Sequence, residues 1–227
     1  MSRPSSKRLV IFDCDGVLID SEPIACAIMA QVMTECGFPL HETDIHAFIG
    51  QSGQDTYAQI ETRFGKKLPD DIRERSRAIY RKRFETDAMP AIKGVAELID
   101  GLSTPACVAS NSSHEYLDMV LNSARLFDKF PNRVFSSYDV ARPKPHPDLF
   151  EHAARTLGAA ARDCIVIEDS VHGVNAGVAA DMRVIGFCGG GHCMDGHADR
   201  LIAAGAQTVF ASMDEVARQL ATHGYLK

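Results

Sequence analysis

The order of apolar runs along the chain constrains its fold more than any other feature. Most of these short runs are continuously apolar, as expected for strands that are buried on both faces of a sheet. Five such runs are present: Leu9–Phe12, Ala106–Ala109, Val134–Phe135, Cys164–Ile167 and Val184–Phe187. Helical patterns separate the later runs, at Ser113–Ala124, Pro147–Leu157 and Val171–Ala180. This alternation predicts an α/β fold with a doubly wound parallel sheet.

One long stretch interrupts the alternation. From Glu22 to about Ala88 the sequence shows helical periodicity and no strand pattern, and we expect helices at Pro23–Cys36, His41–Ile49, Gln54–Phe64 and Pro69–Glu85. A proline near the start of the first helix and Gly37 just past its end support that prediction. We therefore expect two domains: an α/β core made of residues 1–20 and 89–227, and a helical cap made of residues 21–88.

The bulk composition narrows the classes of function. The 227 residues carry a net charge of −6, which argues against a general nucleic-acid binder and mildly against binding to an anionic membrane. No apolar run approaches the roughly 20 residues of a membrane span. The basic start MSRPSSKR precedes only four apolar residues, which is too few for a signal peptide, so we expect a cytoplasmic protein. The seven cysteines contain no CxxC pair and suggest no disulfide framework. The oligomeric state stays open, a monomer included.

Polar side chains follow four of the predicted strands where each strand ends. In chain order they are Asp13 and Asp15, then Ser110 and Asn111, then Lys144 between two prolines, and finally Glu168 and Asp169. Parallel pairing brings the carboxyl ends of the strands to one edge of the sheet, which is where open α/β sheets bind ligands. The sequence therefore predicts one polar site built from all four segments.

The charges at this edge predict a bound cation. Two carboxylates about 4 Å apart repel by roughly 4 kcal/mol at an effective dielectric near 20. Oxygen ligands of this kind suit Mg2+. Lys144 adds a positive charge for an anionic substrate, and Ser110 and Asn111 can donate hydrogen bonds, so the set fits a phosphoryl group. The alternative for the first segment alone is a plain turn at Asp15-Gly16.

The motifs also resemble a known family. D-x-D-G-V at Asp13–Val17, Ser110-Asn111, Lys144 and Glu168-Asp169 have the order and spacing of the haloacid dehalogenase-like phosphohydrolases over nearly the whole chain. The helical insertion resembles the cap of the β-phosphoglucomutase-like branch. The resemblance implies a Rossmann-like core, a helical cap, a Mg2+ cofactor and a small phosphate ester as the substrate.

The resemblance also implies a role for each matched residue. Asp13 is then the nucleophile that forms an aspartyl-phosphate, and also a metal ligand. Asp15 is the general acid and base, and its backbone carbonyl faces the metal. Ser110 is a catalytic residue that holds the transferring phosphoryl group together with Asn111.

Further residues follow from the same resemblance. Lys144 stabilises the nucleophile and the phosphoryl charge. Glu168 and Asp169 complete the magnesium site, directly or through water. Gly16 permits close backbone approach to the phosphate, and the cap-loop residues Gly50 and Ser52 contact the substrate.

Particular residues of this chain differ from those typical of some branches of the family, and these differences indicate which activity to expect. Haloacid dehalogenases resemble this chain but lack the equivalent of Asp15, and the cap loop Gly50–Thr56 has no lysine of the phosphonatase type. The arginine and histidine typical of mutases are replaced here by Gly53 and Ala25, which favours hydrolysis. The segments Ala109–Leu121 and Phe135–Phe150 resemble those of sugar-phosphate phosphatases of this branch, so we expect a phosphatase for a sugar phosphate or sugar-acid phosphate, with the 6-phosphogluconate type as one candidate. A phosphosugar mutase and a non-catalytic binding protein remain the alternatives.

The segment Phe187–His197, FCGGGHCMDGH, contains two cysteines and two histidines. A zinc site is conceivable, but the spacing lacks the paired C-x2–4-C arrangement of structural zinc sites. We therefore expect a loop after the fifth strand rather than a metal site.

Overall fold

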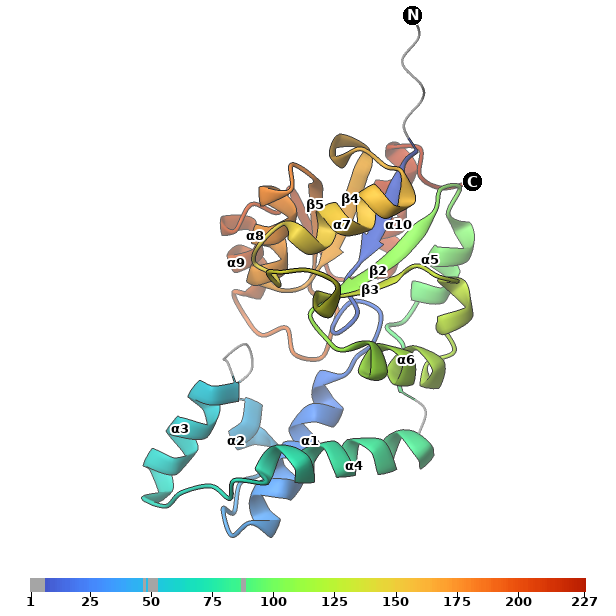
Figure 1. Ribbon diagram of the computed structural model, residues 1–227. Coiled ribbons are helices and arrows are strands. Elements are labelled where there is room, and N and C mark those ends of the chain that lie inside the picture. Colours follow the sequence, from blue (N-terminus) through green and yellow to red (C-terminus); the bar gives the residue numbers. More distant parts are fainter. Residues whose placement is uncertain (1–6, 47, 49–52, 87–88) are drawn as a thin grey trace, which may run out of the picture. The chain divides into compact units, whose positions relative to one another are not determined.

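A six-stranded sheet organises the larger part of the chain in the computed structural model (Figure 1), which describes residues 7–46, 48, 53–86 and 89–227. Its strands are β1 (Leu9–Phe12), β2 (Ala106–Ser110), β3 (Val134–Ser136), β4 (Cys164–Glu168), β5 (Arg183–Phe187) and β6 (Thr208–Phe210). Their order in the sheet is β3-β2-β1-β4-β5-β6, and every neighbouring pair is parallel. The predicted α/β fold is confirmed.

The strand register brings the predicted site residues to one edge. Phe12, the last residue of β1, lies opposite Val108 of β2 and Ile167 of β4. The residues that follow these strands therefore leave the sheet at the same level. Since β1 is central, Asp13 emerges between the ends of β2 and β4.

Helices surround this sheet. They are α5 (Val95–Gly101), α6 (His114–Ser123), α7 (Asp148–Leu157), α8 (Val171–Ala179), α9 (His197–Ala203) and α10 (Met213–Thr222), with 3-10 turns at Phe127–Lys129, Ser137–Asp139 and Ala161–Asp163. Leu9 and Ile11 of β1 belong to one buried cluster with residues of α7, α8 and α9, whereas Val10 and Phe12 are buried on the other face. Burial on both faces explains why β1 is apolar without alternation.

The chain divides into two compact units, Met1–Asp20 with Met89–Lys227, and Ser21–Ala88. The second unit contains α1 (Glu22–Glu35), α2 (Glu42–His46), α3 (Gly53–Phe64) and α4 (Ile72–Thr86). Its own core includes Phe38, whose ring centroid lies 5.5 Å from that of Phe64. α1 has its proline in the first turn, and Gly37 follows it with a φ of +82°, a conformation that suits glycine.

The predicted helices match the observed ones to within a few residues, and the largest differences are at the end of α2 and at the start of α4, which begins at Ile72 rather than at Pro69. α2 ends at His46 and Phe48 lies in a turn, whereas the predicted helix ran on to Ile49, which lies outside the described residues. Sequence periodicity did not predict β6, α5, α9 or α10. β6 has only three residues, all half-buried at the edge of the sheet, so it carries no long apolar run. In the described part of the chain, no helix has the length and apolar character needed to cross a bilayer.

Candidate active site

Lys144 lies at the centre of the polar edge. Its ammonium group donates to Asp13 Oδ1 at 2.6 Å, to Glu168 Oε1 at 2.6 Å and to the backbone carbonyl of Ala109 at 2.8 Å. An ammonium group has three N–H donors, so all three are used here. The side chain is 3% exposed, which makes these charge-assisted hydrogen bonds strong. Lys144 thus joins the carboxyl ends of β1, β2 and β4.

Asn111 holds the backbone of Lys144 in place. The side-chain amide of Asn111 donates to the Lys144 carbonyl at 3.2 Å, and its carbonyl oxygen accepts from the Lys144 N–H at 3.0 Å. Both ends of the Asn111 amide group are therefore bonded to one residue, 33 positions away in the chain. In the structure, the Asn111 side chain positions Lys144.

Glu168 is fully buried and has partners on both carboxylate oxygens. Oε1 accepts from Lys144, and Oε2 accepts from the N–H and the hydroxyl of Ser170 at 3.0 Å each. Ser170 also caps α8, because its hydroxyl accepts from the Gly173 N–H. Glu168 is thereby bonded to the first turn of α8 and to Lys144 at the same time.

Gly173 packs directly against Glu168, and a methyl group there would overlap the carboxylate. Because Lys144 and Ser170 hold that carboxylate, it cannot move aside. We expect Gly173→Ala to lower the free energy of unfolding by about 1–3 kcal/mol, measured by urea denaturation. Gly101→Ala is the matched control: that helical glycine would meet only Leu226, at 3.5 Å, so the variant should be neutral or more stable. Equal stability of Gly173→Ala and the parent chain would contradict this packing.

Asp169 receives hydrogen bonds from two histidines that follow β5. His192 Nε2 lies 2.8 Å from Asp169 Oδ2, and His197 Nε2 donates to the Asp169 backbone carbonyl at 2.6 Å. Gly16 packs against the same carboxylate with a φ of +77°, and a methyl group on it would overlap both Asp169 and His192. The Asp169 carboxylate is therefore held between two segments, the one that follows β1 and the one that follows β5.

Asp15 is also held by neighbours. Its Oδ1 accepts from the Tyr116 hydroxyl at 2.8 Å, and its Oδ2 accepts from the Ser112 hydroxyl at 3.1 Å. Ser112 lies between β2 and α6, and Tyr116 lies in the first turn of α6. Ser110, the last residue of β2, is almost completely buried and accepts from the Ser112 N–H at 3.2 Å.

The buried charges raise the affinity of the acids for protons. Burial raises the pKa of Asp13 well above its usual value; Lys144 lowers it, but Glu168, Asp169 and Asp15 raise it further. Burial also raises the pKa of Asp169, and Glu168 and Asp15 add to this effect. Burial lowers the pKa of Lys144, but Asp13 and Glu168 outweigh burial and raise it above its usual value. Four acids and one lysine meet at this site, so the acids in their ionised forms carry more negative charge than Lys144 compensates.

The donor set fits a divalent cation. Carboxylate oxygens of Asp13, Glu168 and Asp169 lie within 4.8 Å of one another, and all three residues are buried. Oxygen donors with excess negative charge suit Mg2+. Because both oxygens of Glu168 already have partners, Asp13 and Asp169 are the better candidates for direct ligands.

Eight of the site residues predicted from the sequence lie at this edge of the sheet in the structure. They are Asp13, Asp15, Gly16, Ser110, Asn111, Lys144, Glu168 and Asp169. Sequence reasoning did not identify Ser112, Tyr116, His192 or His197 as partners of the acids. His192 and His197 were noted only as part of the loop Phe187–His197, and Tyr116 shows no signal beyond its place in a helix. Gly50 and Ser52 lie outside the described residues.

Comparison with known proteins identifies the family. Residues 10–187 match the model of the haloacid dehalogenase-like hydrolases. The chain belongs to this family. It is 31% identical to the 6-phosphogluconate phosphatase of Escherichia coli (strain K12) over 185 residues, which cover 81% of this chain and 83% of that protein.

Similar solved structures support the same family assignment. A conserved haloacid dehalogenase-like protein of unknown function from Agrobacterium tumefaciens str. C58 is 38% identical, with a TM-score of 0.85 over 96% of this chain and 99% of that one. A hydrolase of the family from Deinococcus radiodurans R1, solved with bound phosphate and sodium, is 32% identical, with a TM-score of 0.85 over 99% of both chains. The predicted membership of the haloacid dehalogenase-like phosphohydrolases is confirmed.

Proposed function

We propose that this haloacid dehalogenase-like hydrolase is a magnesium-dependent phosphatase for a small polar phosphomonoester, a sugar phosphate or sugar-acid phosphate. The observation that carries the proposal is the contact between the buried Asp13 and the Lys144 ammonium group, at 2.6 Å, inside a group of three buried carboxylates. The name of the E. coli relative, a 6-phosphogluconate phosphatase, supports the substrate class, and the phosphate bound to the D. radiodurans relative supports a phosphoryl site.

The proposed reaction has two steps on Asp13. Lys144 binds Asp13 Oδ1, which leaves Oδ2 to attack the phosphorus atom and form an aspartyl-phosphate. The bond from phosphorus to the substrate oxygen breaks, and Asp15 donates a proton to that oxygen. Asp15 then accepts a proton from water, whose oxygen attacks the phosphorus, so that inorganic phosphate leaves and Asp13 is regenerated.

The remaining residues position these groups. We propose that Asp13 and Asp169 hold Mg2+, with the Asp15 carbonyl as a further ligand. Glu168 then mainly fixes Lys144. When bound, Mg2+ supplies positive charge that offsets repulsion between the substrate phosphate and the carboxylates. His192 keeps the Asp169 carboxylate oriented, as partners of metal ligands commonly do.

Removal of divalent cations tests the proposal. We expect phosphate release from p-nitrophenyl phosphate to fall to background in EDTA, because only Lys144 then offsets the negative charge of the acids beside the anionic substrate. Added Mg2+ should restore the rate, whereas Na+ at the same ionic strength should not. A rate in EDTA equal to the rate in Mg2+ would contradict the proposal.

A screen of metabolite phosphates in Mg2+, with kcat/KM for each hit, identifies the substrate. We expect the highest values for sugar phosphates or sugar-acid phosphates. Interconversion of two hexose phosphates that depends on a bisphosphate activator would instead indicate a mutase. No turnover of any ester would indicate a binding protein.

A further inference from the structure

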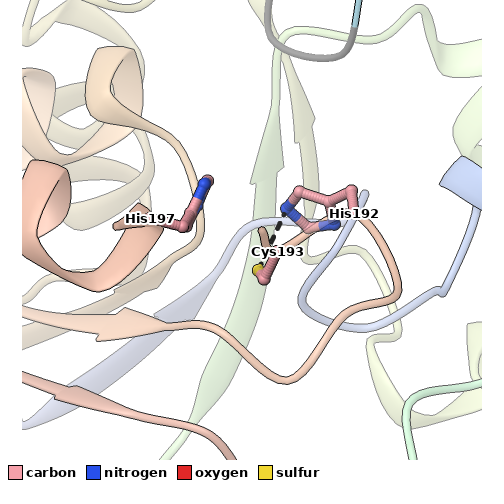
Figure 2. Close-up of side chains that lie close together, drawn as sticks. All are labelled: His192, Cys193 and His197. Carbon is pink, nitrogen blue, oxygen red and sulfur yellow. Dashed lines mark hydrogen bonds between the residues drawn. The ribbon is translucent and has the colours of Figure 1, made fainter. Parts of the chain in front are cut away.

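The chain from the end of β5 to the start of α9 brings two imidazoles and a thiol together beside the cluster of three buried carboxylates. Figure 2 shows His192 and Cys193 on the connecting loop and His197 at the start of α9. One ring nitrogen of each histidine and the sulfur of Cys193 lie within 4.8 Å of one another. His192 Nε2 lies 3.5 Å from Cys193 Sγ, and the two imidazole ring centroids lie 5.4 Å apart. Nitrogen and sulfur donors therefore converge on one point.

The loop that carries these donors is anchored. The Gly191 N–H donates to Asp20 Oδ1 at 2.9 Å, and the Cys193 N–H donates to the Gly190 carbonyl at 3.1 Å. His192 is 6% exposed, and a methyl group on Gly190 would press against its ring, 2.8 Å from Nδ1. A ligand that binds here meets donors that are already close together, so little conformational entropy is lost on binding.

The chemistry of the donors selects the ligand. Imidazole nitrogen and thiolate sulfur suit Zn2+, whereas Mg2+ prefers oxygen. Asp169 Oδ2 lies 2.8 Å from His192 Nε2, beside the three donors that already lie within 4.8 Å of one another, and a cation bound to those three can draw it in as a fourth ligand. The carboxylates of Asp13 and Glu168 lie next to Asp169 and favour a cation electrostatically. We propose that His192, Cys193, His197 and Asp169 form a binding site for Zn2+, separate in its donors from the magnesium site except for Asp169.

Binding displaces protons that the side chains hold in the cation-free protein. Nε2 of His192 and of His197 each donate to Asp169, so a cation bound to these nitrogens moves each imidazole proton to Nδ1. The exposed Arg200, which donates to His197 Nδ1 at 3.0 Å, has to release that nitrogen. The Cys193 thiol loses its proton to solvent, because a thiol bound to Zn2+ is deprotonated.

Because Asp169 is shared with the magnesium site, binding of Zn2+ affects catalysis. This part of the inference rests on the proposed function as a magnesium-dependent phosphatase. Asp169 belongs to the donor sets of both cations. When Zn2+ occupies the site, Asp169 and His192 are drawn toward it, and the magnesium site loses one of its two best ligands. Zn2+ therefore inhibits the enzyme by competing with Mg2+ for Asp169.

Binding is tested without catalysis, by titrating the full chain with Co2+ in magnesium-free buffer. We expect the intense visible bands of tetrahedral Co2+ together with a thiolate-to-cobalt charge-transfer band, saturating at one equivalent and abolished by added Zn2+. Cys193→Ser should remove the charge-transfer band and weaken Zn2+ binding by about tenfold or more. Cys36→Ser is the matched control, because Cys36 is a half-buried thiol in the helical unit, and it should bind like the parent.

Two results would overturn the site: only weak octahedral Co2+ bands in the parent chain, or a charge-transfer band that persists in Cys193→Ser. Inhibition is then tested by adding Zn2+ at several Mg2+ concentrations, with each rate expressed relative to the same variant without Zn2+. Mg2+ should relieve inhibition, and Cys193→Ser should need about tenfold more Zn2+. Equal inhibition of both chains would overturn the coupling. If the chain hydrolyses no ester, the proposed function fails, and the Co2+ titration still decides the site.

Discussion

Asp13→Asn should reduce phosphate release from p-nitrophenyl phosphate in Mg2+ by about 10^4-fold or more, because removal of a covalent nucleophile eliminates the pathway through the aspartyl-phosphate. The same substitution should not lower the melting temperature in magnesium-free buffer. Burial and the neighbouring carboxylates already raise the pKa of Asp13, so a neutral side chain there relieves repulsion, and Lys144 keeps Glu168 as its partner.

Asp15→Asn separates the two chemical roles. It retains the nucleophile but loses the proton donor and acceptor. The p-nitrophenolate ion leaves without a proton, so the first step should persist and the second should become slow. We expect a burst of one p-nitrophenolate per chain followed by slow turnover, measured by stopped-flow absorbance.

Parent-like steady-state rates in Asp13→Asn would show that the aspartyl-phosphate proposal is incorrect.

Lys144→Met should strongly reduce both the activity and the stability of the protein. The ammonium group contacts Asp13 and Glu168 at 2.6 Å each, and a thioether leaves these buried carboxylates without a counter-charge. We expect kcat/KM to fall by about 10^3-fold, and the free energy of unfolding at neutral pH in the absence of Mg2+ to fall by about 3–5 kcal/mol. Urea denaturation measures the second effect.

The pH dependence of the Lys144→Met variant has a definite sign. Lys144 lowers the pKa values of Asp13 and Asp169, so its removal raises both further. A carboxyl group whose pKa is higher in the folded state binds more protons when folded, so its contribution to stability falls as pH rises above about 4, the unfolded value. The stability deficit of Lys144→Met relative to the parent should therefore shrink as pH falls toward 4.

Lys129→Met is the matched control for this substitution. Lys129 pairs with Asp100 at 2.6 Å, but the Asp100 side chain is 67% exposed. Such a surface pair contributes at most about 1 kcal/mol. A loss of stability in Lys144→Met no larger than in Lys129→Met would contradict the view that Lys144 neutralises buried acids.

Continuous apolar runs made most of the sheet predictable. Leu9–Phe12 and Cys164–Ile167 are buried on both faces, and only strands in the middle of a parallel sheet require such runs. β6 escaped prediction because an edge strand of three half-buried residues leaves no comparable pattern. α9 has only seven residues and one buried apolar residue, Leu201, so it leaves little periodic signal. α10 does carry a signal in the sequence, because its buried residues Met213, Val216 and Leu220 have the spacing of one helix face.

The candidate site was predictable to the extent that strand ends define it. Asp13, Ser110 and Glu168 lie at or directly after strands that pair in parallel, so the topology alone places them together. The residues that orient these acids were not predictable in the same way. Tyr116 reaches Asp15 over 101 positions in the chain, and His192 reaches Asp169 from a glycine-rich loop, so no local pattern connects them.

The amino-acid sequence by itself determined the α/β fold, the family and the set of acids, lysine and amide groups at one edge of the sheet, because burial patterns and strand ends are local properties of the chain. Only the tertiary structure decided which group bonds to which: Asn111 to the backbone of Lys144, Ser170 to Glu168, and His192 and His197 to Asp169. Hydrogen bonds act over about 3 Å in space regardless of separation along the chain, so folding has to bring these partners together before their pairing is defined.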